Sequence, residues 1–218
     1  MRIRRNFGFF MGIFTADNGT SEIEIKRSRF LGAVKKTESE QAARDFIAEI
    51  KKQNSLAKHN CYAYIVIDDG QERVKYSDDG EPQGTAGLPI LNVLKAKNLK
   101  NVACVVTRYF GGIKLGAGGL VRAYTDAAAT AVSRAEKKEL LECAVFKIDF
   151  SYENYKKFAN FSLPEKCVVE KPEYGEKVSL TVVLSKDLSN EFLNKFNDFF
   201  LKRQPISRLS DVWREFSV

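Results

Sequence analysis

The stretch that decides the fold runs from Tyr76 to Tyr124 and reads YSDDGEPQGTAGLPILNVLKAKNLKNVACVVTRYFGGIKLGAGGLVRAY. It holds eight of the chain's 14 glycines, and these fall in two short loops. Between the loops, Val102–Thr107 (VACVVT) is an unbroken apolar and β-branched run, which is typical of a buried strand. The alanine-rich segment Leu120–Leu141 after the second loop favours a helix. The order strand, glycine-rich loop, helix can bring backbone N–H groups and a helix N-terminus onto one anion.

Three cations accompany the second glycine loop and make it a candidate anion-binding or nucleic-acid-binding site. Arg108 ends the buried strand, Lys114 lies inside the loop, and Arg122 lies in the first turn of the expected helix. Aromatic side chains beside such a loop can stack on the bases of a single-stranded nucleic acid. The residues that we expect in this site are Arg108, Tyr109, Lys114, Gly116, Gly118, Gly119 and Arg122.

The alternative to an anion-binding role is a purely structural role for the same glycines, because glycine also allows tight turns and the close approach of a helix to a strand. The second loop is not a Walker A loop, since no Gly-Lys-Ser/Thr follows its glycines. It also lacks the third spaced glycine of a dinucleotide-binding fingerprint. The sequence therefore leaves both the anion site and the structural role open.

A second candidate site is polar and centres on the first glycine loop. Its members are His59, Asp78, Asp79, Glu81 and Thr85. His59, the only histidine, stands roughly 6.5 Å from Cys61 in an extended segment, which is too far for a direct nucleophilic pair. A single histidine with loop carboxylates is a weak pattern for a metal, and aspartates in turns commonly accept backbone N–H bonds. We therefore expect Asp78 and Asp79 to hold the loop, and no catalytic residue, metal or cofactor.

Charge is spread unevenly along the 218 residues, whose net charge is +7. Residues 1–138 hold 23 Lys and Arg against 15 Asp and Glu, a net +8, whereas residues 139–218 hold 12 against 13, a net −1. The excess positive charge therefore lies with the glycine loops, which favours an anionic partner. The alternative is a charge that serves solubility alone.

The four cysteines form no C-x-x-C pair and lie inside expected strands. This pattern indicates that the cysteines are reduced core residues of a cytoplasmic protein, and it argues against a disulfide framework or a zinc site. No apolar run approaches the roughly 20 residues that a membrane-spanning helix needs, so we expect no membrane partner.

Period-two alternation and helical spacing predict the remaining elements of an N-terminal domain, residues 19–138. Residues 1–18 are expected to be a tail, in which residues 1–10 precede an alternative start at Met11. Two strands follow, joined by the basic turn Lys26–Arg29, which we interpret as a solvated hairpin end. Thr37 and Glu40 form a capping-box pattern for the next helix. The other expected elements are strands Ser21–Lys26, Arg29–Lys35, Cys61–Ile67 and Glu72–Ser77, and helices to about Gln53 and over Ala86–Asn98.

Between Lys137 and Cys143 the composition turns charged and the pattern begins again, which predicts a second domain, residues 139–218. Its elements follow in the order β-α-β-β-α-β, the ferredoxin-like arrangement. The expected segments are Val145–Ser151, Tyr152–Phe161, Cys167–Tyr174, Lys177–Leu184, Leu188–Arg203 and Ile206–Val212.

Six motifs in and just before the opening stretch resemble those of the IMPACT/YigZ family. They are YAY at 62–64, SDDGEP at 77–82, GTAG at 84–87, PILNVL at 89–94, VVTRYFGGIKLG at 105–116 and GGLVRAY at 118–124. The resemblance covers about residues 20–135. The segment that follows is similar to the small C-terminal domain of the bacterial members.

The resemblance implies a two-domain α+β protein. Its N-terminal α/β sandwich would share the fold of a small-subunit ribosomal protein domain and of domain four of the translocation elongation factor. Eukaryotic members of the family restrain the kinase that responds to amino-acid starvation, and they carry an additional domain. We expect a translation-associated regulatory protein that binds RNA or ribosomes through the basic glycine-loop face. The alternatives are an enzyme that binds a phosphorylated small molecule at the loops and an adaptor that binds another protein; the oligomeric state stays open.

Overall fold

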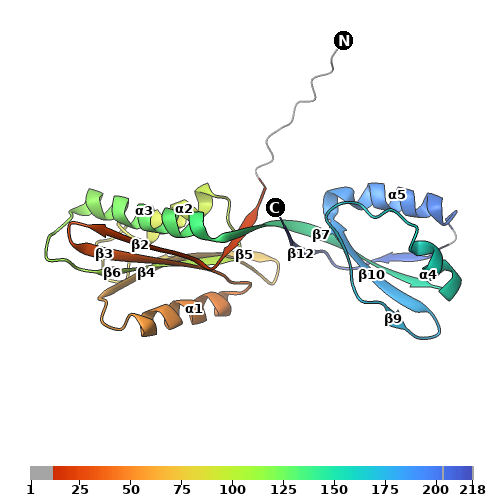
Figure 1. Ribbon diagram of the computed structural model, residues 1–218, viewed down its shortest axis with the longest axis horizontal. Coiled ribbons are helices and arrows are strands. Elements are labelled where there is room, and N and C mark those ends of the chain that lie inside the picture. The colour runs from red at the N-terminus through yellow and green to blue at the C-terminus, as the bar shows by residue number, and fades with distance from the viewer. Residues whose placement is uncertain (1–11, 203, 218) are drawn as a thin grey trace, which may run out of the picture. The chain divides into compact units, whose positions relative to one another are not determined.

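The computed structural model describes residues 12–202 and 204–217. These residues form two compact units (Figure 1). The first holds the described residues up to Glu139 together with Ser217, and the second holds Leu140–Phe216. Each unit packs α-helices against antiparallel strands, which confirms the predicted α+β class. No helix in the described part of the chain is both long enough and apolar enough to cross a membrane.

The first unit is built on a five-stranded antiparallel sheet with the strand order β2-β3-β6-β4-β5. Two helices, α2 and α3, cover one face of this sheet, and α1 covers the other (Figure 1). The strands are β2 (Gly19–Ile25), β3 (Ser28–Lys36), β4 (His59–Asp68), β5 (Gln71–Ser77) and β6 (Val102–Tyr109). The helices are α1 (Glu40–Gln53), α2 (Gly87–Ala96) and α3 (Ala117–Arg134).

The first five residues of the central strand β6, Val102–Val106, are all apolar because helices cover both faces of the strand. Val102, Cys104 and Val106 lie in the core that includes α2 and α3. Ala103 and Val105 lie in the smaller core beneath α1. The unbroken run VACVVT is therefore explained by burial on both sides of the sheet.

The cap of α1 differs from the prediction. Ser39 is the N-cap, and its hydroxyl accepts a hydrogen bond from the backbone N–H of Ala42 at 3.1 Å. The Thr37 hydroxyl is buried without a hydrogen-bond partner among the described residues. Glu40 contacts Tyr64 and Arg44 instead of closing a capping box. The predicted capping box of Thr37 and Glu40 is therefore wrong: the N-cap is Ser39, two residues after Thr37.

The prediction of a tail over residues 1–18 is wrong for its last part, since Phe14–Asp17 form strand β1. Ala16 is fully buried, and the Thr15 hydroxyl donates to the Asn101 carbonyl oxygen at 3.0 Å. β1 pairs with the start of β7 (Glu136–Phe150). A strand of four residues is too short to show a clear alternation. Residues 1–10 of the predicted tail lie outside the described part of the chain.

The helix predicted over Leu120–Leu141 begins and ends earlier than expected. α3 ends at Arg134, and Glu136 already belongs to β7. Residues 136–139 of β7 pair with β1 in the first unit, and residues 143–150 pair with β10 (Val178–Ser185) in the second. The division between the two units thus falls inside one strand, without the break in the strand pattern that we expected at this point.

In the second unit, β7, α4, β8, β10, α5 and β11 follow the predicted β-α-β-β-α-β order, with the sheet order β8-β10-β7-β11. The single strand predicted over Cys167–Tyr174 is divided into β8 and β9. Phe150 lies at the centre of its core, within 6.3 Å of four aromatic rings, those of Tyr155, Phe158, Phe196 and Phe200. Two short strands, β9 and β12, extend the sheet beside β10 and β7. Its remaining elements are α4 (Tyr152–Phe158), β8 (Cys167–Val169), β9 (Glu173–Tyr174), a 3₁₀ turn (Lys186–Leu188), α5 (Ser189–Phe199), β11 (Ile206–Arg208) and β12 (Val212–Ser217).

Candidate functional site

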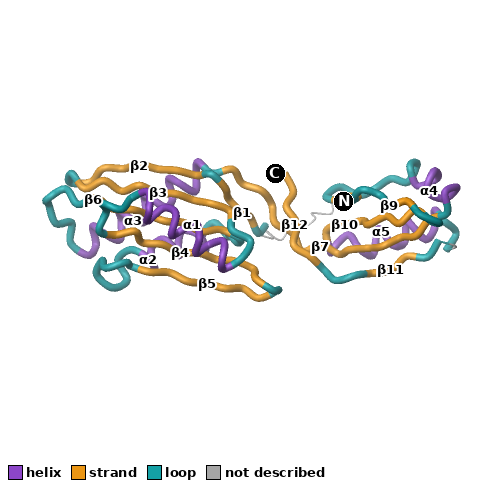
Figure 2. The backbone as a smooth tube through the Cα atoms, turned by 90° about the horizontal axis from the view of Figure 1, so that it is seen from below, coloured by secondary structure: helices purple, strands orange, loops and turns teal. Residues whose placement is uncertain are grey.

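The loops that carry the predicted site residues gather at one end of the first unit's sheet (Figures 1 and 2). Strand β6 ends there, opposite the starts of β3 and β4, since Tyr109 pairs with Arg29 and Arg108 pairs with His59. We call this region the loop end. It consists of the β2–β3 turn at 26–27, the connection 54–58, the first glycine loop at 78–86 and the second glycine loop at 110–116.

Asp78 organises the first glycine loop. One of its carboxylate oxygens accepts the backbone N–H groups of Ala86 and Gly87 at 3.0 and 2.8 Å. The other accepts the N–H of Gly84 at 2.8 Å. Asp79 accepts the backbone N–H of Asn60 at 2.7 Å and also pairs with Lys51. Asp78 thus binds backbone N–H groups within the loop as expected, whereas Asp79 connects the loop to β4 and α1.

His59 and Thr85 bind the backbone of the same loop. The Thr85 hydroxyl donates to the Pro82 carbonyl oxygen at 2.7 Å. Nδ1 of His59 lies 2.9 Å from the Asp79 carbonyl oxygen. Because a carbonyl oxygen can only accept, Nδ1 carries the proton, and Nε2 is the nitrogen left to accept. These contacts give both side chains a structural role.

Cys61 is not an activated nucleophile. Its Sγ donates to the Asp78 carbonyl oxygen at 2.9 Å. Burial raises the pKa of the Cys61 thiol to about 12, and the nearby carboxylates add to this effect. Since the thiolate is the reactive form, Cys61 is unreactive at neutral pH.

Arg108 and Glu81, which the sequence placed in two separate candidate sites, form one buried ion pair. Nη1 of Arg108 donates to Oε1 of Glu81 at 2.7 Å, and the Tyr124 hydroxyl donates to the same oxygen at 2.9 Å. Burial raises the pKa of Tyr124, so this hydroxyl keeps its proton. The prediction that Arg108 offers a free positive charge to an anion is wrong, because its charge is already balanced inside the unit.

Two aromatic residues follow one another at the end of β6, and they differ in exposure. The Tyr109 hydroxyl donates to Oδ1 of Asn54 at 2.9 Å, which ties this ring to the C-terminal end of α1. Phe110 is 56% exposed, and the Arg108 guanidinium lies 5.4 Å from its ring centroid. The exposed ring at the loop end is therefore Phe110, whereas the sequence singled out Tyr109.

The basic β2–β3 turn meets the second glycine loop, a contact that the sequence did not reveal. A Cβ atom on Gly111 would lie 2.0 Å from the backbone carbonyl of Arg27, so only glycine permits this approach. The Gly111 N–H also donates to the Ser28 hydroxyl at 3.1 Å. Both Lys26 and Arg27 have positive φ, 47° and 66°. Two-residue hairpin turns of this kind favour Asn-Gly, so two basic residues stand here in strained backbone positions.

The second glycine loop leads into an uncapped helix N-terminus. Gly116 is the N-cap of α3, with φ of 73°, and no side chain accepts a hydrogen bond there. Gly118 is exposed, and a Cβ added there would meet nothing within 4 Å beyond its own helix backbone and chain neighbours, whereas one on Gly119 would lie 3.1 Å from Leu115. The free N–H groups of this first turn can therefore receive an anion.

Two of the predicted cations remain available at this end of α3. Lys114 and Arg122 are exposed and form no ion pair within the described part of the chain. Because α3 begins at Ala117, Arg122 lies in its second turn, whereas the sequence analysis placed it in the first turn. Along the chain, Lys114 and Arg122 thus lie on either side of the free N–H groups of residues 117–119.

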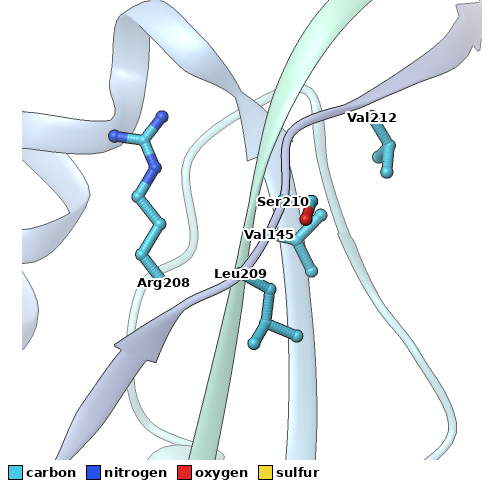
Figure 3. Close-up of a pocket in the computed structure, with 5 residues that line it drawn as sticks. All are labelled: Val145, Arg208, Leu209, Ser210 and Val212. Carbon is cyan, nitrogen blue, oxygen red and sulfur yellow. The ribbon is translucent and has the colours of Figure 1, made fainter. Parts of the chain in front are cut away.

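A hollow of about 720 Å³ in the second unit is a weaker candidate. Figure 3 shows the Arg208 side chain on one side of its strand and Leu209 and Val145 on the other. Arg208 pairs with Asp211 at 2.9 Å. No set of polar groups converges in this hollow, whereas ligand sites need a few such groups.

Comparisons with known proteins agree with the sequence motifs. The Impact N-terminal domain matches residues 26–132. The IMPACT family member YvyE of Bacillus subtilis (strain 168) is 40% identical over 174 residues, 80% of each chain. An IMPACT family member of Haemophilus influenzae is 38% identical over 164 residues, 75% of this chain and 79% of its own. A crystal structure of a hypothetical protein superposes with a TM-score of 0.60 and 28% identity, covering 91% of this chain and 98% of that chain. This chain therefore belongs to the IMPACT family.

Proposed function

We propose that this chain is a translation-associated regulatory protein of the cytoplasm that binds RNA, free or in the ribosome, through its loop end. The observation that carries the proposal is the contact between the turn Lys26-Arg27 and the second glycine loop at Gly111. It joins two basic segments that are more than 80 residues apart in the sequence. The strain accepted at Lys26 and Arg27 supports a role for these two side chains beyond the fold.

The charges that face outward at the loop end are positive. Asp78, Asp79 and Glu81 each accept two or more hydrogen bonds from neighbouring groups of the chain. Their negative charge is thus directed inward. Among the loop-end residues, the exposed cations that form no ion pair in the described part of the chain are Lys26, Arg27, Lys58 and Lys114. Several cations beside an exposed aromatic ring suit a single-stranded nucleic acid, in which phosphates alternate with stackable bases.

Family membership supports the translational setting. The resemblance implies that eukaryotic members regulate translation, and that the first domain shares its fold with domains that work on the ribosome. A fold alone does not assign a function, so the residues of the loop end carry the argument. The unreactive Cys61 thiol and the inward-facing carboxylates favour binding over catalysis.

The strained turn allows a sharp test. Replacing Lys26-Arg27 by Asn-Gly supplies the residues that this turn conformation favours, so the variant should be more stable by about 1 kcal/mol. The same variant should bind RNA more weakly, because two cations are removed. The slope of log K against log salt should fall by roughly 0.7 for each single-strand phosphate contact that is lost. The measurements are urea unfolding and fluorescence anisotropy with a labelled decauridylate at several salt concentrations.

Lys114→Ala is the second variant, and Lys95→Ala is its control. Lys95 is also exposed and unpaired in the described structure, but it lies in the last turn of α2. Lys114→Ala should weaken RNA binding and reduce the salt slope, while Lys95→Ala should leave both unchanged. Co-sedimentation of the protein with ribosomes, at low and high salt, tests whether the bound RNA is ribosomal. Unchanged affinity and slope in both the turn variant and Lys114→Ala would overturn the proposal.

A protein-binding adaptor is the second candidate, because a mainly apolar groove of about 460 Å³ runs between α2 and α3. Leu88 and Val121 line it and are 39% and 37% exposed. If the loop-end variants bind RNA like the unaltered protein, this groove becomes the better candidate for the functional surface. Leu88→Asp should then abolish partner binding without affecting the loop end.

A further inference from the structure

A cleft lies on the other face of the sheet, between α1 and strands β4 and β5. Its volume is about 160 Å³. The cleft is lined on the helix side by Arg44, Ile47 and Lys51, and on the strand side by Tyr62, Tyr64 and Lys75. None of these residues belongs to the loop-end turn or to the second glycine loop. The cleft is therefore a separate feature of the first unit.

The lining of this cleft carries three cations and no carboxylate. Lys75 is exposed and forms no ion pair with any residue in the described ranges. Arg44 donates through Nη2 to Glu40, and Lys51 donates to Asp79, both at 2.7 Å. A guanidinium has five N–H donors and an ammonium has three, so both side chains retain donors for a second anion.

Two tyrosines form the floor of the cleft. The Tyr62 and Tyr64 rings are parallel to within 3°, and their centroids are 6.4 Å apart. Tyr64 is 1% exposed and donates its hydroxyl to Oε1 of Glu40 at 2.7 Å, which fixes its position. Tyr62 is partly exposed, and Nζ of Lys51 lies 6.0 Å from its centroid. An aromatic face is thus presented to the cleft with cations beside it.

We propose that this cleft binds one 5′-nucleotide unit, with its phosphate on Lys75 and Arg44 and its base against the Tyr62 ring. Base–aromatic stacking tolerates every base, because each base has a π-face. Pockets for drug-sized ligands measure roughly 300–1,000 Å³, so a cleft of about 160 Å³ can hold only one ring system. The unit is either a free nucleotide or one residue of an RNA strand, since both present the same phosphate and base. The proposal is independent of the loop-end function.

The test is a nuclear magnetic resonance titration of the full chain with uridine 5′-monophosphate, uridine and inorganic phosphate. The monophosphate should shift the amide signals of the cleft residues. Uridine alone and phosphate alone should bind at least about tenfold more weakly, because each probe uses only half of the site. Lys75→Gln should weaken monophosphate binding about tenfold, since it removes a charged donor. Lys95→Gln, an equally exposed change on α2, should have no effect.

Tyr62→Leu tests the stacking contact. This variant should bind the monophosphate more weakly, while its binding of inorganic phosphate should stay unchanged.

Decauridylate distinguishes a free nucleotide from one residue of an RNA strand. If decauridylate binds at least tenfold more tightly than the monophosphate, and Lys75→Gln weakens this binding, the ligand is an RNA strand. If the two bind with equal affinity, the ligand is the free nucleotide. Lys114→Ala should leave monophosphate binding intact, so failure of the loop-end proposal does not affect this one. The proposal is overturned if no cleft signal shifts, or if Lys75→Gln and Tyr62→Leu, both folded, bind the monophosphate like the unaltered protein.

Discussion

Glu81 and Arg108 form an ion pair of 2.7 Å whose side chains are only 4% and 7% exposed. Glu81 belongs to the first glycine loop, and Arg108 to β6. Tyr124 of α3 donates to the same carboxylate oxygen. One carboxylate therefore fastens a loop to the sheet and to a helix, and it holds the first glycine loop in place at the loop end.

Glu81→Gln should lower the free energy of unfolding by about 3–5 kcal/mol. Removing one partner of a buried ion pair leaves the other charge uncompensated in a region of low dielectric constant. Arg108 is especially sensitive, because its Nε already lacks a hydrogen-bond partner in the described structure. Urea unfolding followed by circular dichroism measures the loss. Glu153→Gln is the control, since its pair with Lys157 is exposed, and its unfolding midpoint should stay unchanged.

The burial of Arg108 could have been predicted from the sequence, but its partner could not. Along β6, Arg108 shares a face with Val106 and Cys104, and that face packs against α2 and α3. An arginine at this position has to meet a buried counter-charge. Nothing in the local pattern selects Glu81, which lies 27 residues earlier in a loop. The motif SDDGEP locates this acid, but only the fold brings it to the arginine.

Gly111→Ala should destabilise the protein by about 1–3 kcal/mol, the usual cost of forcing an extra atom into a packed site. The new Cβ would stand 2.0 Å from the Arg27 carbonyl, and two backbone segments have to separate to admit it. RNA affinity should fall with stability, because the turn and the loop lose their relative position. Urea unfolding and anisotropy with decauridylate measure the two effects.

Gly118→Ala is the matched control for Gly111→Ala. Apart from its chain neighbours and the backbone of its own helix, nothing lies within 4 Å of the Gly118 Cβ position, and alanine has the higher helix propensity. This variant should be equally stable or more stable by up to about 1 kcal/mol. Gly111→Ala with the stability of the unaltered protein would contradict the close contact between turn and loop.

Local propensity misled the prediction at both ends of α3. Gly118 and Gly119 are poor helix formers, so the expected start moved to Leu120, although the helix begins at Ala117. At the other end, the helix-favouring sequence EKKELLE suggested continuation to Leu141. Glu136–Glu139 instead pair with β1, and this long-range pairing overrides propensity. The partner strand is only four residues long and lies more than 115 residues earlier, so the local sequence does not predict this pairing.

Cys61 and Cys104 should resist alkylation in the native protein. Burial raises the pKa of both thiols to about 12, against 9.0 for an unburied thiol, so their thiolate fraction stays small at pH 8.5. Their contribution to stability is complete below pH 9.0 and is lost as the pH rises from there to about 12, because the unfolded chain ionises first. Mass spectrometry after iodoacetamide treatment at pH 8.5 should find them labelled only in urea. Rapid labelling of Cys61 without urea would contradict its burial and make it a candidate nucleophile.

The division between the units leads to a prediction about where the chain can be cut. A fragment of residues 11–139 keeps the whole β1–β7 pairing, from Phe14 opposite Glu139 to Asp17 opposite Glu136. It should therefore unfold cooperatively with a well-dispersed amide spectrum. A fragment of residues 11–135 lacks these four partners, but β1 keeps its hydrogen bonds to Asn98, Lys100, Asn101 and the backbone N–H of Lys36.

The shorter fragment should be less stable by on the order of 2 kcal/mol, the net value of a few backbone hydrogen bonds. Urea midpoints of the two fragments measure the difference. Thr15→Val in the longer fragment is an independent check, because it removes the hydroxyl that donates to Asn101 and should cost about 1 kcal/mol. Equal midpoints would show that β1 adds nothing to the first unit. Failure of the longer fragment to fold would show that the strand β7, continuous through the division, makes the first unit depend on the second.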